Sequence, residues 1–213
     1  MSLAEAEEAA TADLSAGPER LGKAIERLIG EDAVSLPFLP EPRRQILLAA
    51  AQALPYRLAR PVIGEGEKAV LQDFALCETI PDPSPLRALA AALESLIAAA
   101  LARLARPPLA EAPRLNDLIV QRYPAGSAGI TPHRDHIRYR GLVAIVTLAG
   151  RDPLYVCADR SGRDARAVPM PAGSLLLMRA PPFGGRSDRP FHFLERVTED
   201  RISLGMRHDV QSA

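Results

Sequence analysis

The sequence predicts an α+β protein in which N-terminal helices pack outside a C-terminal antiparallel β-barrel. Three segments with helical periodicity come first, and from Leu115 onward short apolar runs alternate with Gly, Pro and Asp. Because parallel strands need long crossover helices and none interrupts these runs, we expect antiparallel sheets. The 213 residues, 47% hydrophobic and 24% charged, fit one compact domain.

The expected helices cover residues 18–29, 42–54 and 84–106. Each begins beside a proline, which is suited to the first turn of a helix, and Ser84 is the expected N-cap of the third. The expected strands lie in LNDLIVQRY, GLVAIVTLAG, PLYVCAD, SLLLMR, FHFLERV and RISLGMRHDV. We therefore divide the chain into a helical extension with a substrate-side segment (1–113) and a barrel core (114–213).

Residues 55–82 are rich in turn formers and match no helix strongly. Since segments of this kind often carry binding residues, we expect this one to contact the substrate. Residues 126–132 are expected to form a loop.

Several classes of protein are excluded by composition. The most apolar stretch, 88–102, is shorter than the roughly 20 residues that span a membrane. Cys77 and Cys157 form no disulfide or zinc-ribbon pattern, and the N-terminus is acidic where an export signal would be basic. We expect a cytoplasmic monomer that does not associate with membranes.

The net charge is zero, but the charges are unevenly distributed. Residues 1–113 carry 11 basic and 16 acidic side chains, whereas residues 114–213 carry 15 and 10, and all 15 of these basic residues are arginines. Arginine suits planar carboxylate or phosphate partners, although a GC-rich genome would produce the same bias.

Three residues form a candidate metal site. His133 and Asp135 are two positions apart, so on a strand they would point to one face, and His192 follows in the aromatic segment FHFLERV. Two histidines and one carboxylate form the facial triad that binds non-haem Fe(II) and leaves open coordination positions. Taken alone, His192 also fits a buried core histidine bonded to a backbone carbonyl.

The segment RISLGMR adds a candidate anion site. On a strand, Arg201, Ser203 and Arg207 share one face, and two arginines facing a barrel interior require an anionic partner. A dicarboxylate bound to iron at one end and to a guanidinium at the other would satisfy them. A solvated outer face is the alternative.

Together these motifs resemble the Fe(II)/2-oxoglutarate dioxygenases. LNDLIVQRYPAGSAGITPHRD and PAGSLLLMR are similar, more narrowly, to the AlkB-like branch, and the similarity covers roughly residues 114–208. The resemblance implies a double-stranded β-helix (jelly-roll) barrel that uses Fe(II), with 2-oxoglutarate and O2 as co-substrates.

The resemblance also implies a role for each motif residue. His133, Asp135 and His192 would hold iron, Arg201 would pair with the distal carboxylate of 2-oxoglutarate, and Ser203 would assist it. Further contacts with the co-substrate would come from Tyr123, Gln121 and Arg207. Gln121 stands where the branch more usually has Asn, and Arg201 follows His192 by nine positions, a short spacing that resembles other 2-oxoglutarate oxygenases.

Three functions remain open at this point. The first is oxidative demethylation of alkylated nucleobases, which the basic C-terminal half favours. The absence of Trp and the 4% aromatic residues count against this first function. The second is hydroxylation of a protein side chain or a small molecule, favoured by the short His192 to Arg201 spacing and the zero net charge. The third is a non-enzymatic binding protein, which the presence of every expected ligand disfavours.

Overall fold

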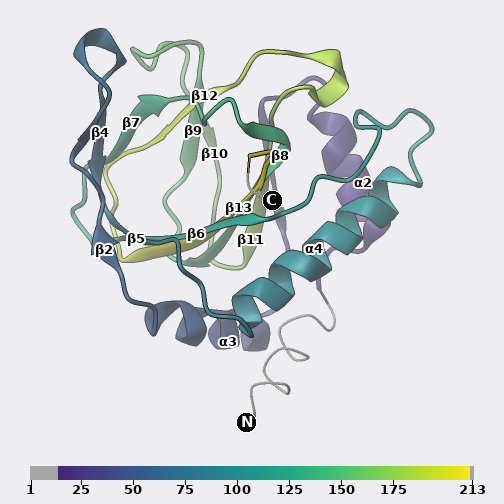
Figure 1. Cartoon of the computed structure of the whole chain (residues 1–213), viewed down its shortest axis with the longest axis horizontal. Coiled ribbons are helices and arrows are strands. Elements are labelled where there is room, and N and C mark those ends of the chain that lie inside the picture. The colour runs from purple at the N-terminus through teal and green to yellow at the C-terminus, as the bar shows by residue number, and fades with distance from the viewer. Residues whose placement is uncertain (1–13, 212–213) are drawn as a thin grey trace.

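The computed structural model describes residues 14–211, which form two antiparallel sheets and three helices (Figure 1). The first sheet contains β1 (Ala33–Pro37), β2 (Arg57–Leu58), β5 (Ala75–Cys77), β6 (Asp117–Tyr123), β8 (Tyr139–Ala149), β11 (Ser174–Arg179) and β13 (Arg201–Asp209). The second contains β3 (Val62–Ile63), β4 (Val70–Asp73), β7 (Gly129–His133), β9 (Leu154–Cys157), β10 (Arg166–Val168) and β12 (Phe191–Leu194). Short 3-10 turns lie at Gly66–Lys68 and Phe183–Gly185.

The strand orders are β1-β11-β8-β13-β6-β5-β2 and β10-β9-β12-β7-β4-β3. Apart from the hairpins β3–β4 and β9–β10, most neighbours in these lists are distant in sequence, as in a double-stranded β-helix, so the predicted fold class is confirmed. All six strands expected from residue 115 onward are present. The expected loop over 126–132 is partly wrong, because Gly129–His133 forms β7 between β12 and β4.

Residues 33–77 add strands to both sheets: β1 pairs with β11, β5 with β6, and β4 with β7. The sequence did not indicate these strands because each is short and lies outside a clear apolar run bounded by turn residues, the signal that marked the equally short β9 and β12.

The expected helices are α2 (Pro18–Arg27), α3 (Glu41–Gln52) and α4 (Pro85–Leu101). The Ser84 hydroxyl accepts a hydrogen bond from the Leu86 amide at 3.2 Å, which confirms the predicted N-cap. The α-helix α4 ends before Arg106 because the amides of Arg103 and Leu104 bond to carbonyls three residues back, which tightens the chain into a turn.

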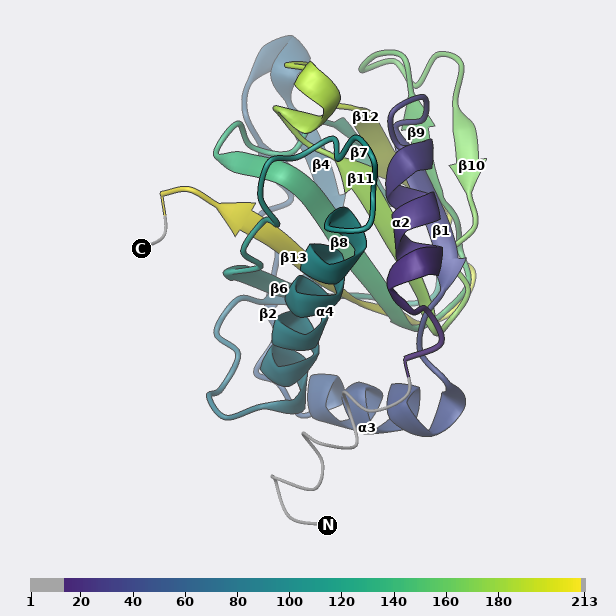
Figure 2. The same cartoon turned by 90° about the vertical axis from the view of Figure 1, so that its right-hand side faces the viewer.

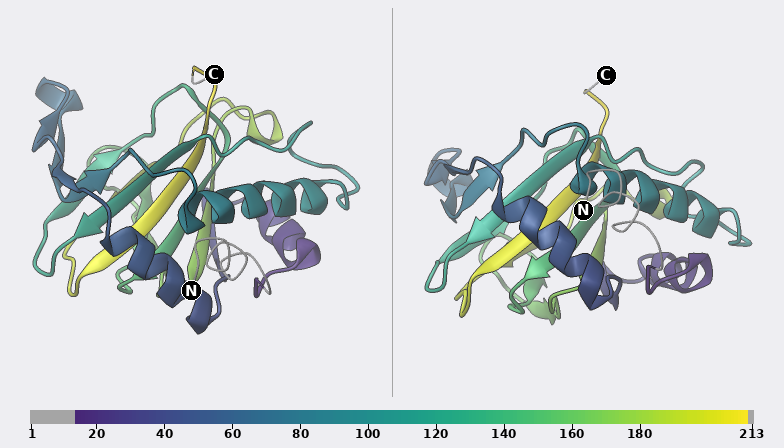
Figure 3. Two further views of the ribbon diagram at one scale, coloured as in Figure 1. Left: turned by 60° about the horizontal axis from the view of Figure 1, so that its bottom comes forward. Right: turned by 90° about the horizontal axis from the view of Figure 1, so that it is seen from below.

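The helices cover the outer face of the first sheet, as Figures 2 and 3 show. Leu21, Leu47 and Leu93 are fully buried there with sheet residues such as Val146 and Leu204. A second cluster, which includes Ile145, Val156 and Met170, joins strands of the two sheets. The helices therefore bury one face of the first sheet, and the opposite face of that sheet faces the second sheet.

Within residues 14–211, no helix combines the length and the apolar character needed to cross a membrane. Residues 1–13, on which the expectation about export mainly depends, lie outside the described part. Cys77 and Cys157 are both free and buried.

Gly129 controls the approach of β7 to β12. Its φ is +82°, and a Cβ at this position would lie 1.9 Å from the carbonyl oxygen of Leu194. The register between the two strands shifts between the His192–His133 and Leu194–Ile130 pairs, which marks a bulge. Only glycine allows this contact, so Gly129 helps to keep His133 opposite His192.

We expect Gly129→Ala to lower the free energy of unfolding by more than about 2 kcal/mol, because the left-handed backbone alone costs about 1–2 kcal/mol and the carbonyl contact adds to it. Gly126→Ala is the matched control, since Gly126 has φ +85° with nothing within 4 Å of a Cβ. Chemical denaturation measures both. Equal losses in the two variants would contradict a special role for the β7–β12 contact.

Candidate metal and anion site

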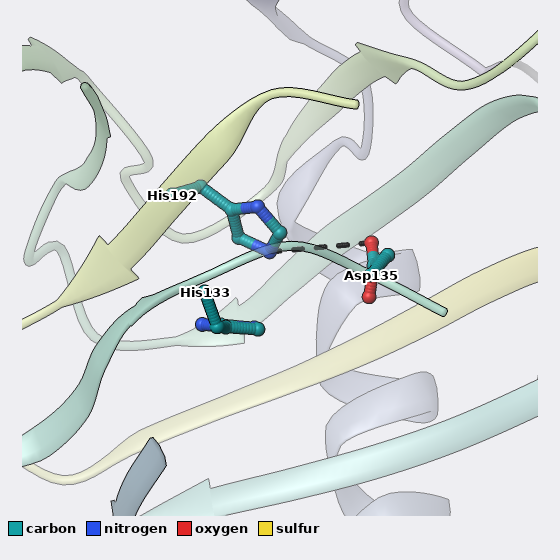
Figure 4. A group of neighbouring side chains, drawn as sticks. All are labelled: His133, Asp135 and His192. Carbon is teal, nitrogen blue, oxygen red and sulfur yellow. Dashed lines mark ion pairs between the residues drawn. The ribbon is translucent and has the colours of Figure 1, made fainter. Parts of the chain in front are cut away.

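Three ligand side chains meet at one end of the second sheet. His133 ends β7, His192 is its cross-strand partner on β12, and Asp135 follows β7 in an extended loop (Figure 4). One ligand atom from each lies within 4.8 Å of the others, and His192 Nε2 is 4.0 Å from Asp135 Oδ2. The sequence placed His133 and Asp135 on one strand; the structure places only His133 in β7.

Both imidazoles are oriented by backbone carbonyls. His133 Nδ1 lies 2.9 Å from the Thr131 oxygen, and His192 Nδ1 lies 3.3 Å from the Pro190 oxygen. Since a carbonyl only accepts hydrogen bonds, Nδ1 carries the proton in each ring and Nε2 is left with a free lone pair. His192 is therefore a buried histidine bonded to a backbone carbonyl and also a member of the His-Asp-His cluster.

The protonation states suit metal binding. Burial, together with His192, lowers the pKa of His133 to about 3, and burial also lowers the pKa of His192. Burial would raise the pKa of Asp135, but its interactions with Arg207, first of all, and with the two histidines outweigh this effect and lower that pKa. The cluster therefore offers two neutral imidazoles and one carboxylate at neutral pH.

Strand β13 presents its polar side chains to the space between the sheets. Arg201, Ser203 and Arg207 line a small cavity together with His133 and His192, whereas Ile202, Leu204 and Met206 pack in the cluster under the helices. The solvated-face alternative is therefore wrong, because Arg201 is 3% and Arg207 8% exposed.

Arg201 is a buried cation that forms no ion pair among residues 14–211, although the carboxylate of Asp152 acts on its charge from beyond ion-pair distance. Its guanidinium donates to Ser203 Oγ at 3.0 Å and approaches the sulfur of Met170, while Nε has no hydrogen bond. Burial lowers its pKa, which records the cost of this unpaired charge. Such a group requires an anion from outside the chain.

Tyr123 and Gln121 stand opposite Arg201 and Ser203 on β6. The ring of Tyr123 lies 5.6 Å from the Arg201 guanidinium carbon, and burial raises the pKa of its hydroxyl to about 12. Tyr123 is therefore a neutral hydrogen-bond donor at physiological pH, and both residues line the same small cavity.

Arg207 has a different environment from Arg201. Its Nε lies 3.5 Å from Asp135 Oδ1 and its Nη1 lies 3.8 Å from Asp117 Oδ2. Burial would lower its pKa, but Asp135, Tyr139 and Asp117 raise it. Arg207 thus stabilises the ionised form of the candidate carboxylate ligand.

Two residues that contact the cluster were not expected from the sequence. Asp117 contacts Arg207, and Arg189 donates to the backbone oxygen of Asp135 at 2.5 Å. Arg189 comes from an irregular segment before β12, where no periodic pattern indicates which way a side chain points.

A larger cleft of about 600 Å³ opens in front of the cluster. Its walls come from β2 to β7, from the start of β8, from β13 and from the loops that precede β8 and β12. The lining residues are Arg57, Arg60, Ile63, Val70, Gln72, Phe74, Leu76, Glu78, Ile119, Gln121, Ile130, His133, Arg134, Asp135, His136, Tyr139, Arg189 and Arg207. Many belong to residues 55–82, the segment expected to contact substrate.

Comparisons with known proteins agree with this fold. No protein-family model and no curated protein matches the sequence. The structure is similar to a prolyl hydroxylase from Trichoplax adhaerens, in complex with a peptide fragment of the hypoxia inducible factor oxygen degradation domain, with TM-score 0.66, 15% identity and 91% of each chain covered. It is also similar to OsALKBH1 (TM-score 0.59, 18% identity, 83% of this chain and 97% of that one).

A third similar structure is the epimerase SnoN in complex with Fe3+, alpha ketoglutarate and nogalamycin RO. It has TM-score 0.59 and 18% identity, with 87% of this chain and 83% of that chain covered. At these identities the comparisons establish the fold, and the function must be argued from the site.

We expect Asp135→Ala and His192→Ala each to weaken Mn(II) binding at least tenfold, because each removes one of three protein ligands. His208→Ala is the matched control, since His208 lies outside the cluster. Calorimetry on the purified protein measures all three. Unchanged affinity in both ligand variants would show that the metal binds elsewhere.

Proposed function

We propose that this chain is an Fe(II)- and 2-oxoglutarate-dependent dioxygenase that hydroxylates a C–H bond of its substrate. The observation that carries this proposal is one small cavity that joins the two histidines of the His-Asp-His cluster to a buried arginine that forms no ion pair. Two imidazoles and a carboxylate fit a divalent metal of the Fe(II) type and the arginine fits a carboxylate, so one dicarboxylate can bind both.

The donor set fits Fe(II). Two imidazole nitrogens and one carboxylate leave up to three adjacent coordination positions for other ligands. Asp135 Oδ2 is buried without a hydrogen bond, so the chain itself leaves this acceptor unsatisfied. His133, Asp135 and His192 are the proposed ligands, in agreement with the motif resemblance.

The second half of the cavity fits 2-oxoglutarate. Arg201 would bind its distal carboxylate, with Ser203 and the Tyr123 hydroxyl as hydrogen-bond partners. Gln121 and Arg207 would line the path toward the metal. SnoN, which shares the fold, is described with iron and alpha ketoglutarate, and this supports the proposal.

When bound, iron and 2-oxoglutarate supply the oxidising chemistry, in which O2 is consumed and 2-oxoglutarate becomes succinate and carbon dioxide. The chain supplies orientation and a protected environment. The carbonyls of Thr131 and Pro190 hold the imidazoles, and Arg207 holds Asp135 ionised. The apolar residues of the small cavity, including Ile145 and Leu154, limit access of water.

The substrate class separates two versions of this proposal. Demethylation of an alkylated nucleobase is supported by the likeness to OsALKBH1 and by the arginines of the cleft. Hydroxylation of a protein side chain or a small molecule is supported by the likeness to proteins described with a peptide and with nogalamycin RO. Phe74 and Tyr139, the two aromatic rings other than histidine in the cleft lining, are 6% and 7% exposed, which leaves little surface for stacking a base.

We expect Arg201→Lys to raise the Kd for 2-oxoglutarate at least tenfold, about 1.4 kcal/mol, because lysine cannot bond both carboxylate oxygens in parallel. Mn(II) affinity should stay within twofold of the parent. Arg151→Lys, at an exposed arginine, is the control. Calorimetry on the Mn(II)-loaded protein gives both constants, and an unchanged Kd in Arg201→Lys would assign Arg201 another role.

If the substrate is nucleic acid, a methylated single strand should bind with a log–log salt slope of roughly −2 or steeper, which corresponds to about three phosphate contacts at about 0.7 each. Fluorescence anisotropy at several salt concentrations measures the slope. A flat response, together with no loss of the methyl group from methyladenine or methylcytosine, would exclude this version and leave the protein or small-molecule substrate.

A further inference from the structure

We infer that the substrate is a compact molecule with an apolar body and an anionic group, a carboxylate or a phosphate, bound by Arg60, Arg134 and Arg189 in the large cleft. This inference rests on the proposed oxygenase function and specifies its substrate class. Three features of the cleft support it: an excess of positive charge, three arginines without an ion pair and an apolar wall.

The cleft carries an excess of positive charge. Of its five arginines, Arg57 pairs with Glu78 and Arg207 contacts Asp135. Arg60, Arg134 and Arg189 form no ion pair with any carboxylate in residues 14–211. Because a divalent metal and a doubly charged co-substrate would cancel each other, the excess of three charges would remain in the loaded protein.

Two of these arginines are held in place without being neutralised. Arg134 lies with its guanidinium carbon 4.0 Å from the centre of the Phe191 ring. Arg189 donates one N–H to the Asp135 backbone oxygen, which leaves its other donors free. Guanidinium groups arranged in this way can bind an anion with less loss of side-chain freedom than mobile ones.

Arg60 lines the same cleft from a different segment of the chain. It precedes β3, and its side chain has no hydrogen bond or ion pair among the described contacts, whereas its backbone oxygen accepts a bond from the Gln72 side chain at 2.8 Å. The backbone at Arg60 is therefore anchored while the guanidinium remains available.

The same cleft has an apolar wall formed by Ile63, Val70, Phe74, Leu76, Ile119 and Ile130. Ile63 is 51% exposed, whereas Phe74 is 6% and Leu76 8% exposed. The wall is therefore apolar in depth and open to solvent at Ile63. A substrate with an apolar body would cover Ile63 and pack along this wall.

The geometry favours a compact molecule over a polymer. A volume of about 600 Å³ is in the ordinary range for small-molecule sites. The three arginines of the cleft that lack an ion pair, Arg60, Arg134 and Arg189, all line this one cavity. Arg138, just outside it, is already paired with Asp209.

Four octyl compounds test the inference: octanoate, octyl phosphate, octanol and octylammonium. Each is titrated into protein loaded with Mn(II) and 2-oxoglutarate, in which no turnover occurs. Broadening of the octyl proton signals by Mn(II) reports binding near the metal rather than elsewhere on the surface. We expect octanoate or octyl phosphate to bind at least tenfold more tightly than octanol, and octylammonium to bind more weakly than octanol.

Arg60→Gln and Arg134→Gln should each reduce the preference for the anion over octanol at least threefold. Arg106→Gln removes the same charge at an exposed position that does not line the cleft, and it should leave the preference unchanged. Binding of octanol itself should change by less than twofold in Arg60→Gln, since only the anionic group contacts the arginine.

The better of the two anions identifies the head group, and either result supports the inference. Equal binding of octanol and both anions, or an unchanged preference in both cleft variants, would overturn it. So would a methylated single-stranded oligonucleotide that displaces the octyl anions and binds more tightly than either. If the parent protein still binds Mn(II) and 2-oxoglutarate, these outcomes overturn only the inference about the substrate and leave the proposed function intact. A parent protein that binds neither Mn(II) nor 2-oxoglutarate would overturn both the inference and the proposed function.

Discussion

Strand β13 is buried on both faces, and the rest of the architecture depends on how its two faces are covered. Alternate side chains point to opposite sides of a strand, so the apolar residues Ile202, Leu204 and Met206 require a hydrophobic cover while Arg201 and Arg207 require polar or anionic partners. The three helices cover the apolar side chains, and the two arginines lie in the space between the sheets. A cationic cavity within a barrel is the direct consequence.

The candidate metal cluster depends on a second constraint, the pairing of β7 with β12. His133 and His192 come from distant parts of the chain, yet they are directly opposite across this ladder, with ring centroids 4.3 Å apart. The close contact at Gly129 and the bulge beside it set this register. Asp135 joins the pair from the loop after β7, where Arg189 and Arg207 hold its backbone and its carboxylate.

The two buried arginines, Arg201 and Arg207, differ in their ion pairing and therefore in the direction of their pKa shifts. Arg207 contacts two aspartates, which raises its pKa, whereas Arg201 forms no ion pair among the described residues and burial lowers its pKa. The protein therefore pairs one cation internally and leaves the other for a ligand. The large cleft also contains one paired and one unpaired arginine, since Arg57 pairs with Glu78 and Arg60 forms no ion pair among the described residues.

The class of fold, the three helices and six strands were predictable from the sequence, which also pointed to the candidate residues that the structure gathers around the small cavity. The signals were local: helical spacing, apolar runs between turn residues, alternation along β13 and the His-x-Asp motif can all be recognised in short windows. The short strands between residues 33 and 77, β7 and β10 depend on tertiary structure, because their two to five residues form no apolar run between turn signals and pair as strands only against their neighbours. The roles of Asp117 and Arg189, and the excess charge of the cleft, likewise depend on side chains brought together from different strands and loops. Ion pairing between distant residues determines which arginines are neutralised, and only the folded chain brings those residues into contact.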